Sequence, residues 1–370
     1  MNRRRKMLII ILCGLGILIF GAATWDGVYL KTTYNISKDT YDDEKNIMTE
    51  TQFKLIRGGI QAASSHNMQP WKVKILDEKT FLLYADMEKA LPTIDPKNKQ
   101  LLMSQGTFIS SVKEAAKEMG VVLDVQYSSV NLKEALPLIA TFTILGEEKN
   151  NVDAISSATV GAKSQNSNFD IEKISNLIHE TSRDYEVIWV NEDNKINFQD
   201  YLRKGTIIEA NNQDAMEELL GVFRFTKWDK NKYKYGLSLN TISPAIRMFI
   251  EPIVGATAGW KSFGQSSIAT FEKRLEAEDG YLVLALENPK PLDYILIGEV
   301  LTKLAIGVEG YAIRPAVQLL QPLNGISSNC NDLRREYGIQ GEILQIIGFT
   351  KIKDSYHESV RHQVLDIIIE

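Results

Sequence analysis

Length, composition and charge place this 370-residue chain among ordinary globular proteins, because hydrophobic residues make up 44% and charged residues 24% of it, which argues against long disordered regions. Four of the 42 basic residues precede an N-terminal apolar segment, which leaves 38 basic and 47 acidic residues and a net charge of −9 for the remainder. Phosphate binding needs clustered positive charge, so we do not expect a nucleic-acid-binding protein.

An apolar segment, residues 7–24, follows the basic residues 1–6 and predicts contact with a membrane. Its 17 residues from Met7 to Ala23 would span roughly 26 Å as a helix, which is marginal for a bilayer core. The basic residues would stay in the cytoplasm, so the rest of the chain is expected on the outer side.

Two interpretations of this segment remain open. A retained transmembrane anchor would place Trp25 and Tyr29 at the membrane interface, where aromatic side chains are common. A cleaved signal peptide would use the small residues Gly21 and Ala23 near the cleavage site, and the protein would then be secreted. The basic run before Leu8 also resembles a twin-arginine export signal, so the export route stays open.

The body of the chain mixes helical and strand patterns and predicts an α+β fold. A polar spacer over 25–50 leads to a first half, 51–150, with a helix, a hairpin from 71, a helix over 99–120 and a strand from 121. A Ser- and Asn-rich linker over 151–169 separates it from a second half, 170–350. That half is expected to hold helices over 170–182, 198–225 (with one break), 293–311 and 330–338, strands over 281–287 and 341–349, and an irregular aromatic stretch over 227–246. Residues 351–370 are expected to form a tail in which His357 and His362 are solvated.

The most informative string is ASSHNMQPW, residues 63–71. The amides of Asn67 and Gln69 can both donate and accept hydrogen bonds, and the small Ser64 and Ser65 would let a ligand approach the backbone. Trp71 is expected in the core, His66 can be a satisfied polar residue, and Pro70 would stiffen the loop. Taken alone, the string also fits an ordinary loop between a helix and a strand.

The string resembles the flavin-binding loop of nitroreductase-type proteins, and residues 51–350 resemble their Acg-like branch, whose members are typically monomers with two nitroreductase-like halves in tandem. The resemblance implies one FMN between the halves, with its ring near Ser64, Ser65, Asn67 and Gln69. In HETSRDYE it implies a phosphate site at Thr181, Ser182 and Arg183, because a guanidinium suits bidentate phosphate contact.

Two positions depart from the family pattern. His179 and Ile346 stand where the family has arginine, so the phosphate site would be weaker. Arg314 is a candidate for the missing charge, and Arg57 is a weaker one. No metal site is expected. Cys13 lies in the apolar segment and Cys330 in the folded second half, so no disulfide between them is expected.

The resemblance implies an FMN-dependent oxidoreductase that passes electrons from a small-molecule donor, through flavin N5, to a nitroaromatic or quinone acceptor without a catalytic side chain. An outward-facing domain would lack nicotinamide donors, so two alternatives stay open. The first is a membrane-anchored protein that sequesters FMN without turnover. The second is an interaction domain that has lost the cofactor, which the changes at His179 and Ile346 favour.

Overall fold

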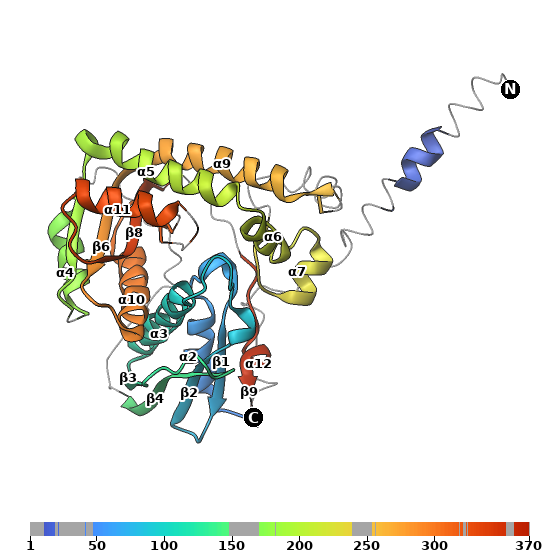
Figure 1. Cartoon of the computed structure of the whole chain (residues 1–370). Helices are drawn as coiled ribbons and strands as arrows, with labels where there is room; N and C mark the ends of the chain where they lie inside the picture. The colour runs from blue at the N-terminus through green and yellow to red at the C-terminus, as the bar shows by residue number, and fades with distance from the viewer. Residues whose placement is uncertain are drawn as a thin grey trace.

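A computed structural model describes residues 11–18, 21, 41, 47–147, 170–181, 183–238, 254–255, 257–317, 319–320, 323, 325–352 and 359–369. Two β-sheets and the helices around them make an α+β fold, as predicted (Figure 1). The predicted linker over 151–169 lies outside the described residues, and the apolar segment over 7–24 is described only at 11–18 and 21. No helix within the described part of the chain is long and apolar enough to cross a membrane.

The first sheet has the strand order β3-β4-β2-β1-β9. Its elements are α2 (Glu50–Ile60), β1 (Trp71–Ile75), β2 (Thr80–Ala85), α3 (Lys99–Met119), β3 (Val121–Tyr127), β4 (Leu138–Glu147), α12 (Val364–Ile367) and β9 (Ile368–Ile369). Gly120 ends α3 with a φ of 67°, a left-handed conformation that suits glycine at a helix C-terminus. The first four strands are antiparallel, whereas β9 pairs parallel to β1, with Val73 opposite Ile368.

The C-terminal residues are therefore not the tail that the sequence predicts. Val364 and Ile367 are buried in the core, and β9 extends the first sheet. His362 is half-buried rather than solvated, while His357 lies outside the described residues. The sequence gives no sign of this return because β9 has only two residues.

The second sheet has the order β5-β6-β8-β7. Its elements are α4 (Ile171–His179), β5 (Glu186–Val190), α5 (Glu192–Ala210), α6 (Gln213–Gly221), α7 (Lys227–Tyr233), α9 (Trp260–Ala277), β6 (Glu278–Leu286), α10 (Pro291–Gly307), β7 (Tyr311–Pro315), α11 (Ile326–Glu336) and β8 (Glu342–Lys351). The expected helix break falls at Asn211 and Asn212, between α5 and α6. The expected irregular stretch is wrong at 227–233, where α7 begins with a capping box between Thr226 and Asp229.

The two sheets share one connectivity. In each, two strands lead into a long central helix and two further strands follow, so β3-β4-β2-β1 and β7-β8-β6-β5 are equivalent orders. The central helices α3 and α10 cross at two glycines. A Cβ on Gly106 would lie 1.8 Å from the Ile295 carbonyl oxygen, and one on Gly298 would lie 1.9 Å from that of Met103. Each helix thus contributes a glycine and the residue three positions before it, which makes the crossing nearly symmetric.

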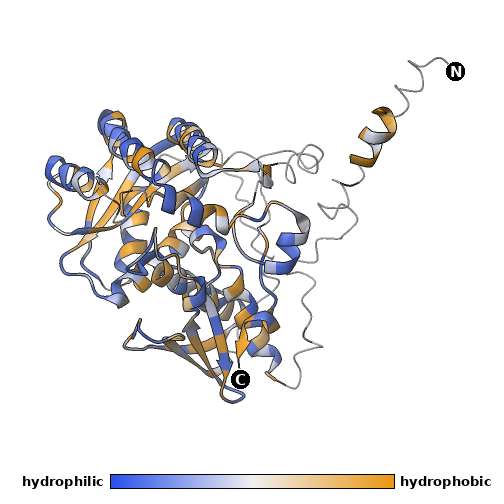
Figure 2. Ribbon diagram, turned by 45° about the vertical axis from the view of Figure 1, so that its right-hand side comes forward, coloured by the Kyte–Doolittle hydropathy of each residue, from blue (hydrophilic) through white to orange (hydrophobic). Residues whose placement is uncertain are grey.

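One hydrophobic core joins the two sheets through this helix pair. It includes buried residues of β2 and α3 as well as buried residues of β6 and α10. Strands of the second sheet are mostly hydrophobic and those of the first sheet are mixed, whereas the outer helices carry many hydrophilic residues (Figure 2). The loop between α2 and β1 lies against α3, near the junction of the two sheets.

Candidate functional site

The loop that carries the ASSHNMQPW string has an unusual backbone. His66, Asn67 and Gln69 have φ values of 49°, 55° and 50°, a left-handed region that residues other than glycine seldom adopt. Such residues persist where the surrounding structure holds them, and they are frequent at functional sites. The loop, residues 64–69, is therefore the first candidate for a site.

Ser64 and Ser65 hold this loop in shape. The Ser64 hydroxyl oxygen accepts a hydrogen bond from the Gln69 backbone N–H at 2.9 Å. The Ser65 hydroxyl donates to Gln100 Oε1 at 2.6 Å, and its backbone N–H donates to the Ser104 hydroxyl at 3.1 Å. Ser64 thus closes the loop on itself, and Ser65 fixes it to the start of α3.

The amides of Asn67 and Gln69 come together, but they bind the backbone of two distant segments. Asn67 Nδ2 donates to the carbonyl oxygens of Gly236 and Val360 at 3.2 and 3.1 Å. Gln69 Nε2 donates to those of Lys234 and Val360 at 2.9 and 3.3 Å. The backbone N–H of His362 donates to Gln69 Oε1 at 2.9 Å. We name residues 359–363 the C-terminal cover, because they lie over the two amides.

Several polar atoms around the loop are buried without a hydrogen-bond partner among the described residues: His66 Nε2, Trp71 Nε1 and Gln105 Oε1. Burial lowers the pKa of His66 to about 4, so its ring is neutral at pH 7. Trp71 is in the core, as predicted, and is 1% exposed. Unpaired buried groups are rare in proteins and indicate water or a ligand. The space beside the loop, near Ser65 and Pro70, is only about 10 Å³, which holds one water at most.

The residues of the predicted phosphate site have other partners. Arg183 Nε lies 3.0 Å from Asp293 Oδ1, and the Asp293 side chain is 6% exposed. The Thr181 hydroxyl donates to the Ile178 carbonyl oxygen at 2.7 Å, while Ser182 lies outside the described residues. Among the described residues, no hydrogen bond or ion pair joins Arg183 to the loop at 64–69.

Arg314, the candidate for the missing charge, lies far from Arg183. It lies on β7, and Arg183 lies just before β5, so the two are at opposite edges of the second sheet. Three strand spacings separate these edges, roughly 14 Å at ~4.8 Å each. Ile346 is fully buried in β8, whereas His179 is exposed at the end of α4.

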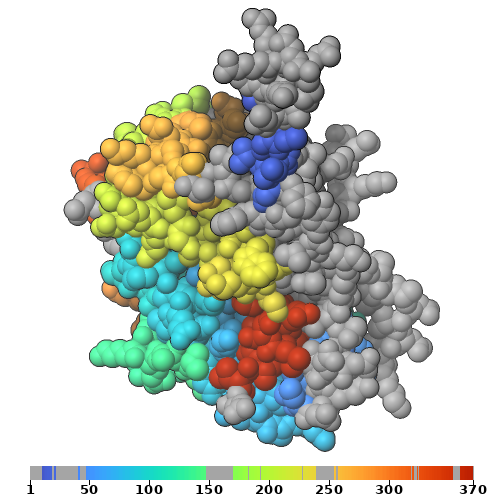
Figure 3. All heavy atoms as spheres, turned by 90° about the vertical axis from the view of Figure 1, so that its right-hand side faces the viewer, coloured from blue at the N-terminus to red at the C-terminus, as the bar shows by residue number. Residues whose placement is uncertain are grey.

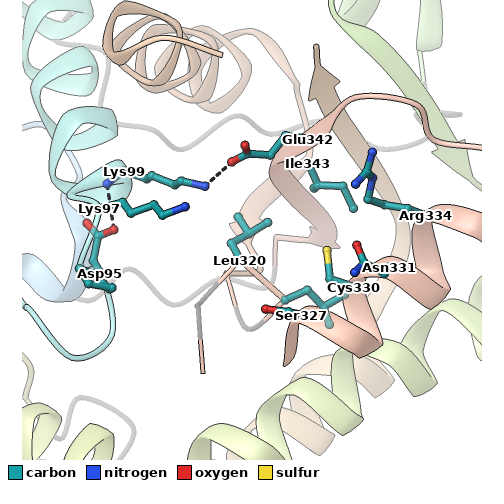
Figure 4. Close-up of a pocket in the computed structure, with 12 residues that line it drawn as sticks. Asp95, Lys97, Lys99, Leu320, Ser327, Cys330, Asn331, Arg334, Glu342 and Ile343 are labelled. Carbon is teal, nitrogen blue, oxygen red and sulfur yellow. Dashed lines mark hydrogen bonds and ion pairs between the residues drawn. The ribbon is translucent and has the colours of Figure 1, made fainter. Parts of the chain in front are cut away.

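A pocket of about 200 Å³ lies where the start of α3 faces α11 and the start of β8 (Figure 4). Figure 4 shows Lys97 and Lys99 on one side and Cys330 and Arg334 on the other. Local sequence patterns do not indicate this pocket, because its walls come from two distant segments, residues 95–99 and 319–343. Lys99 Nζ pairs with Glu342, which also accepts from the Tyr294 hydroxyl at 2.9 Å.

The ionisable groups of this pocket are strongly influenced by burial. Burial raises the pKa of Asp95 to about 6, although the backbone N–H groups of Leu101, Lys99 and Gln100 oppose the change. Burial also disfavours ionisation of Glu342, but its contacts with Lys99 outweigh burial and lower its pKa. Burial raises the pKa of the Cys330 thiol, so this group is protonated at neutral pH and is a poor nucleophile.

The fold and the loop define this chain as an α+β protein with a duplicated sheet connectivity and a shared core. Comparison with known protein families finds no family model that matches the chain, and no curated protein is significantly similar to it. Any function therefore has to be argued from the chain's own residues.

Proposed function

We propose that this chain is an FMN-binding oxidoreductase of the nitroreductase fold, anchored in a membrane through residues 7–24 with its folded part outside. The observation that carries the proposal is the pair of amides, Asn67 and Gln69, held on a left-handed backbone near the junction of two equivalent sheets. Amides offer the donors and acceptors that the ring edge of a flavin requires. The repeated strand order supports two nitroreductase-like halves in one monomer.

The conformation described above does not fit FMN. The space beside the loop is about 10 Å³, and both amides bind residues 234–236 or the C-terminal cover. FMN binding would therefore require these segments to move. Bound FMN would supply electron transfer from a reduced donor to a nitroaromatic or quinone acceptor, and the residues of this chain would hold and orient it.

A second candidate is an FMN-sequestering protein without turnover. It is favoured because a domain on the outer side of a membrane would lack nicotinamide cofactors to reduce a bound flavin. The two candidates share the cofactor and differ only in whether the bound flavin can be reduced.

The first experiment is a visible spectrum of the full-length chain purified in detergent, before and after addition of FMN. A flavin band that remains with the protein through gel filtration supports both candidates. Rapid bleaching by NADPH or a quinol then supports the oxidoreductase, whereas bound flavin that resists both reductants supports sequestration. A protein that stays colourless with added FMN would refute both and leave an interaction domain without cofactor.

The proposed phosphate contact can be tested separately with Arg183→Ala. Loss of one charge-assisted contact should weaken FMN binding by about 10-fold or more. Riboflavin lacks the phosphate, so its affinity should not change. Arg335→Ala is the matched control, because Arg335 is an exposed arginine that pairs with Asp332 on α11. Equal effects of Arg183→Ala on FMN and riboflavin would remove Arg183 from the phosphate site.

A further inference from the structure

The pocket between the start of α3 and α11 is separate from the loop at 64–69. None of the described residues that line it belongs to that loop or to the C-terminal cover. The cover itself packs elsewhere, since Figure 3 shows the red C-terminal residues directly below the yellow residues of α7. A ligand of the pocket therefore does not require the loop or its cover to move.

Three cationic side chains from two distant segments line this pocket. Figure 4 shows Lys97 and Lys99 directed from the α3 side toward the wall that α11 provides, where Arg334 lies. Lys99 pairs with Glu342, so its charge is already balanced. Among the described residues, no hydrogen bond or ion pair involves the ammonium group of Lys97. Lys97 is therefore available to an anion in the pocket.

Arg334 is also only partly paired. Its Nη2 donates to the backbone carbonyl oxygen of Gln340, but its Nε is buried and has no hydrogen-bond partner in the described part of the chain. Buried polar atoms without a partner are rare and indicate a missing water or ligand. Burial raises the pKa of the Cys330 thiol, while the charge of Arg334 acts in the opposite direction. The guanidinium charge is therefore felt at the pocket wall.

The carboxylates of the pocket limit the charge that a ligand can carry. Asp95 accepts hydrogen bonds from the backbone N–H groups of residues 99–101, so its oxygens face the start of α3. Three cations against the carboxylates of Asp95 and Glu342 leave one positive charge. A ligand with a single negative charge would balance it, whereas the second charge of a phosphate would not.

The remaining walls suit a small, partly apolar molecule. Leu319, Leu320 and Ile343 provide apolar contacts, and Ser327 and Asn331 provide polar ones. The volume of about 200 Å³ is below the roughly 300–1,000 Å³ of sites for drug-sized ligands. At ~30 Å³ per water it corresponds to roughly six or seven waters. The ligand is therefore expected to be about the size of a single substituted ring or a short chain.

We propose that this pocket binds a small carboxylic acid with an apolar body, whose carboxylate lies between Lys97 and Arg334. A guanidinium forms strong charge-assisted hydrogen bonds with a carboxylate, and Lys97 contributes a second charge from the opposite wall. The apolar body lies against Leu320 and its neighbours. The site does not depend on flavin binding, because it uses none of the residues proposed to hold FMN.

The first test is isothermal titration of benzoate into the full-length chain in detergent, with detergent alone as the blank. Benzoate carries one negative charge on an apolar ring, and a fragment of this size is expected to bind with a dissociation constant of about 1 mM. Benzamide has the same shape without the charge and should bind at least about 10-fold more weakly. Inorganic phosphate lacks the apolar body and should also bind more weakly than benzoate.

Two variants test the proposed contacts. Arg334→Gln should weaken benzoate binding by about 10-fold, because it removes a charge-assisted hydrogen bond. Lys97→Gln should weaken it by about threefold, since Lys97 is exposed and its charge is partly screened. The matched controls are Arg335→Gln on α11 and Lys117→Gln near the end of α3, both at exposed residues, and they should leave binding unchanged. Thermal melting checks that each variant is folded.

Alkylation of Cys330 gives a readout that does not depend on heat. Cys330 lines the pocket, so saturating benzoate should slow its reaction with iodoacetamide at about pH 8.5, where part of the thiol is ionised. Peptide mass spectrometry separates Cys330 from Cys13, which lies outside the pocket. Benzamide at the same concentration should give much less protection.

Three outcomes would overturn the inference. Benzamide binding as tightly as benzoate, or unchanged benzoate affinity in both variants, would mean that the cations do not hold the ligand. Phosphate binding more tightly than benzoate would mean that the apolar walls have no part in recognition. Absence of both heat and Cys330 protection at about 10 mM benzoate, 10-fold above the expected dissociation constant, would mean that the pocket does not bind such acids.

Discussion

Replacing Gly106 with alanine would force the two central helices apart. The new Cβ would lie 1.8 Å from the Ile295 carbonyl oxygen, and Cβ contacts under 3.0 Å essentially never occur, so the helices must separate by about 1.2 Å. Overpacking of this kind costs about 1–3 kcal/mol, and a gap of up to ~1 Å forfeits a quarter to a half of each dispersion contact along the interface. Better helix propensity returns about 1 kcal/mol. The overpacking cost less this gain leaves up to about 2 kcal/mol, and the weakened dispersion contacts add to it, so we expect a net loss of about 2–3 kcal/mol.

The assay is urea unfolding of the full-length chain in a mild detergent, followed by circular dichroism. Gly298→Ala should cost a similar amount, because its Cβ would lie 1.9 Å from the Met103 carbonyl oxygen. The double variant should lose at least about 1 kcal/mol less than the sum, since one separation of the helices relieves both clashes. Gly221→Ala is the control, because nothing lies within 4 Å of its Cβ position. A stable Gly106→Ala variant, or strictly additive losses, would refute the described crossing.

Much of the fold could be predicted from local patterns. The apolar spacing of 99–119 and the glycine at 120 identify α3 and its end, because a helix face and its C-cap are both local features. The alternation at Trp71–Ile75 identifies β1 for the same reason. The helix at Lys227–Tyr233 lacks an apolar face, but its capping box between Thr226 and Asp229 is a local signal that could have predicted it. The order of strands could not be predicted, since it depends on contacts between distant segments.

The candidate site also combines local features that could be predicted with distant contacts that could not. The string at 63–71 predicted a loop between a helix and a strand, and the structure adds that this loop has left-handed φ values at His66, Asn67 and Gln69. What its amides bind was not predictable, because the partners of Gln69 lie 165 and 293 residues away. The same holds for Lys99, whose partner Glu342 is 243 residues away. Arg183 looked like a phosphate ligand from its motif alone, and nothing local indicates that Asp293 lies beside it.

Two further predictions concern buried ionisable groups. Arg274→Met should cost about 3 kcal/mol in urea unfolding, because it leaves the fully buried carboxylate of Glu278 without its ion pair. Arg335→Met, which breaks an exposed pair, should change stability by less than about 1 kcal/mol, and equal effects of the two variants would contradict this reasoning. His66→Asn removes a titrating ring and keeps a residue type that tolerates a left-handed backbone. Because burial lowers the pKa of His66 from 6.5 to about 4, the unfolded chain binds the extra proton. The contribution of the neutral His66 ring to the free energy of unfolding is therefore complete above pH 6.5. It is lost as the pH falls to 4, a change of about 3 kcal/mol. Urea unfolding at pH 7 and at about pH 4.5 should thus show a larger acid-induced loss for wild type than for His66→Asn. Asp95 titrates in both proteins and cancels in this comparison, so an equal loss in the two would mean that the His66 ring is not buried as described.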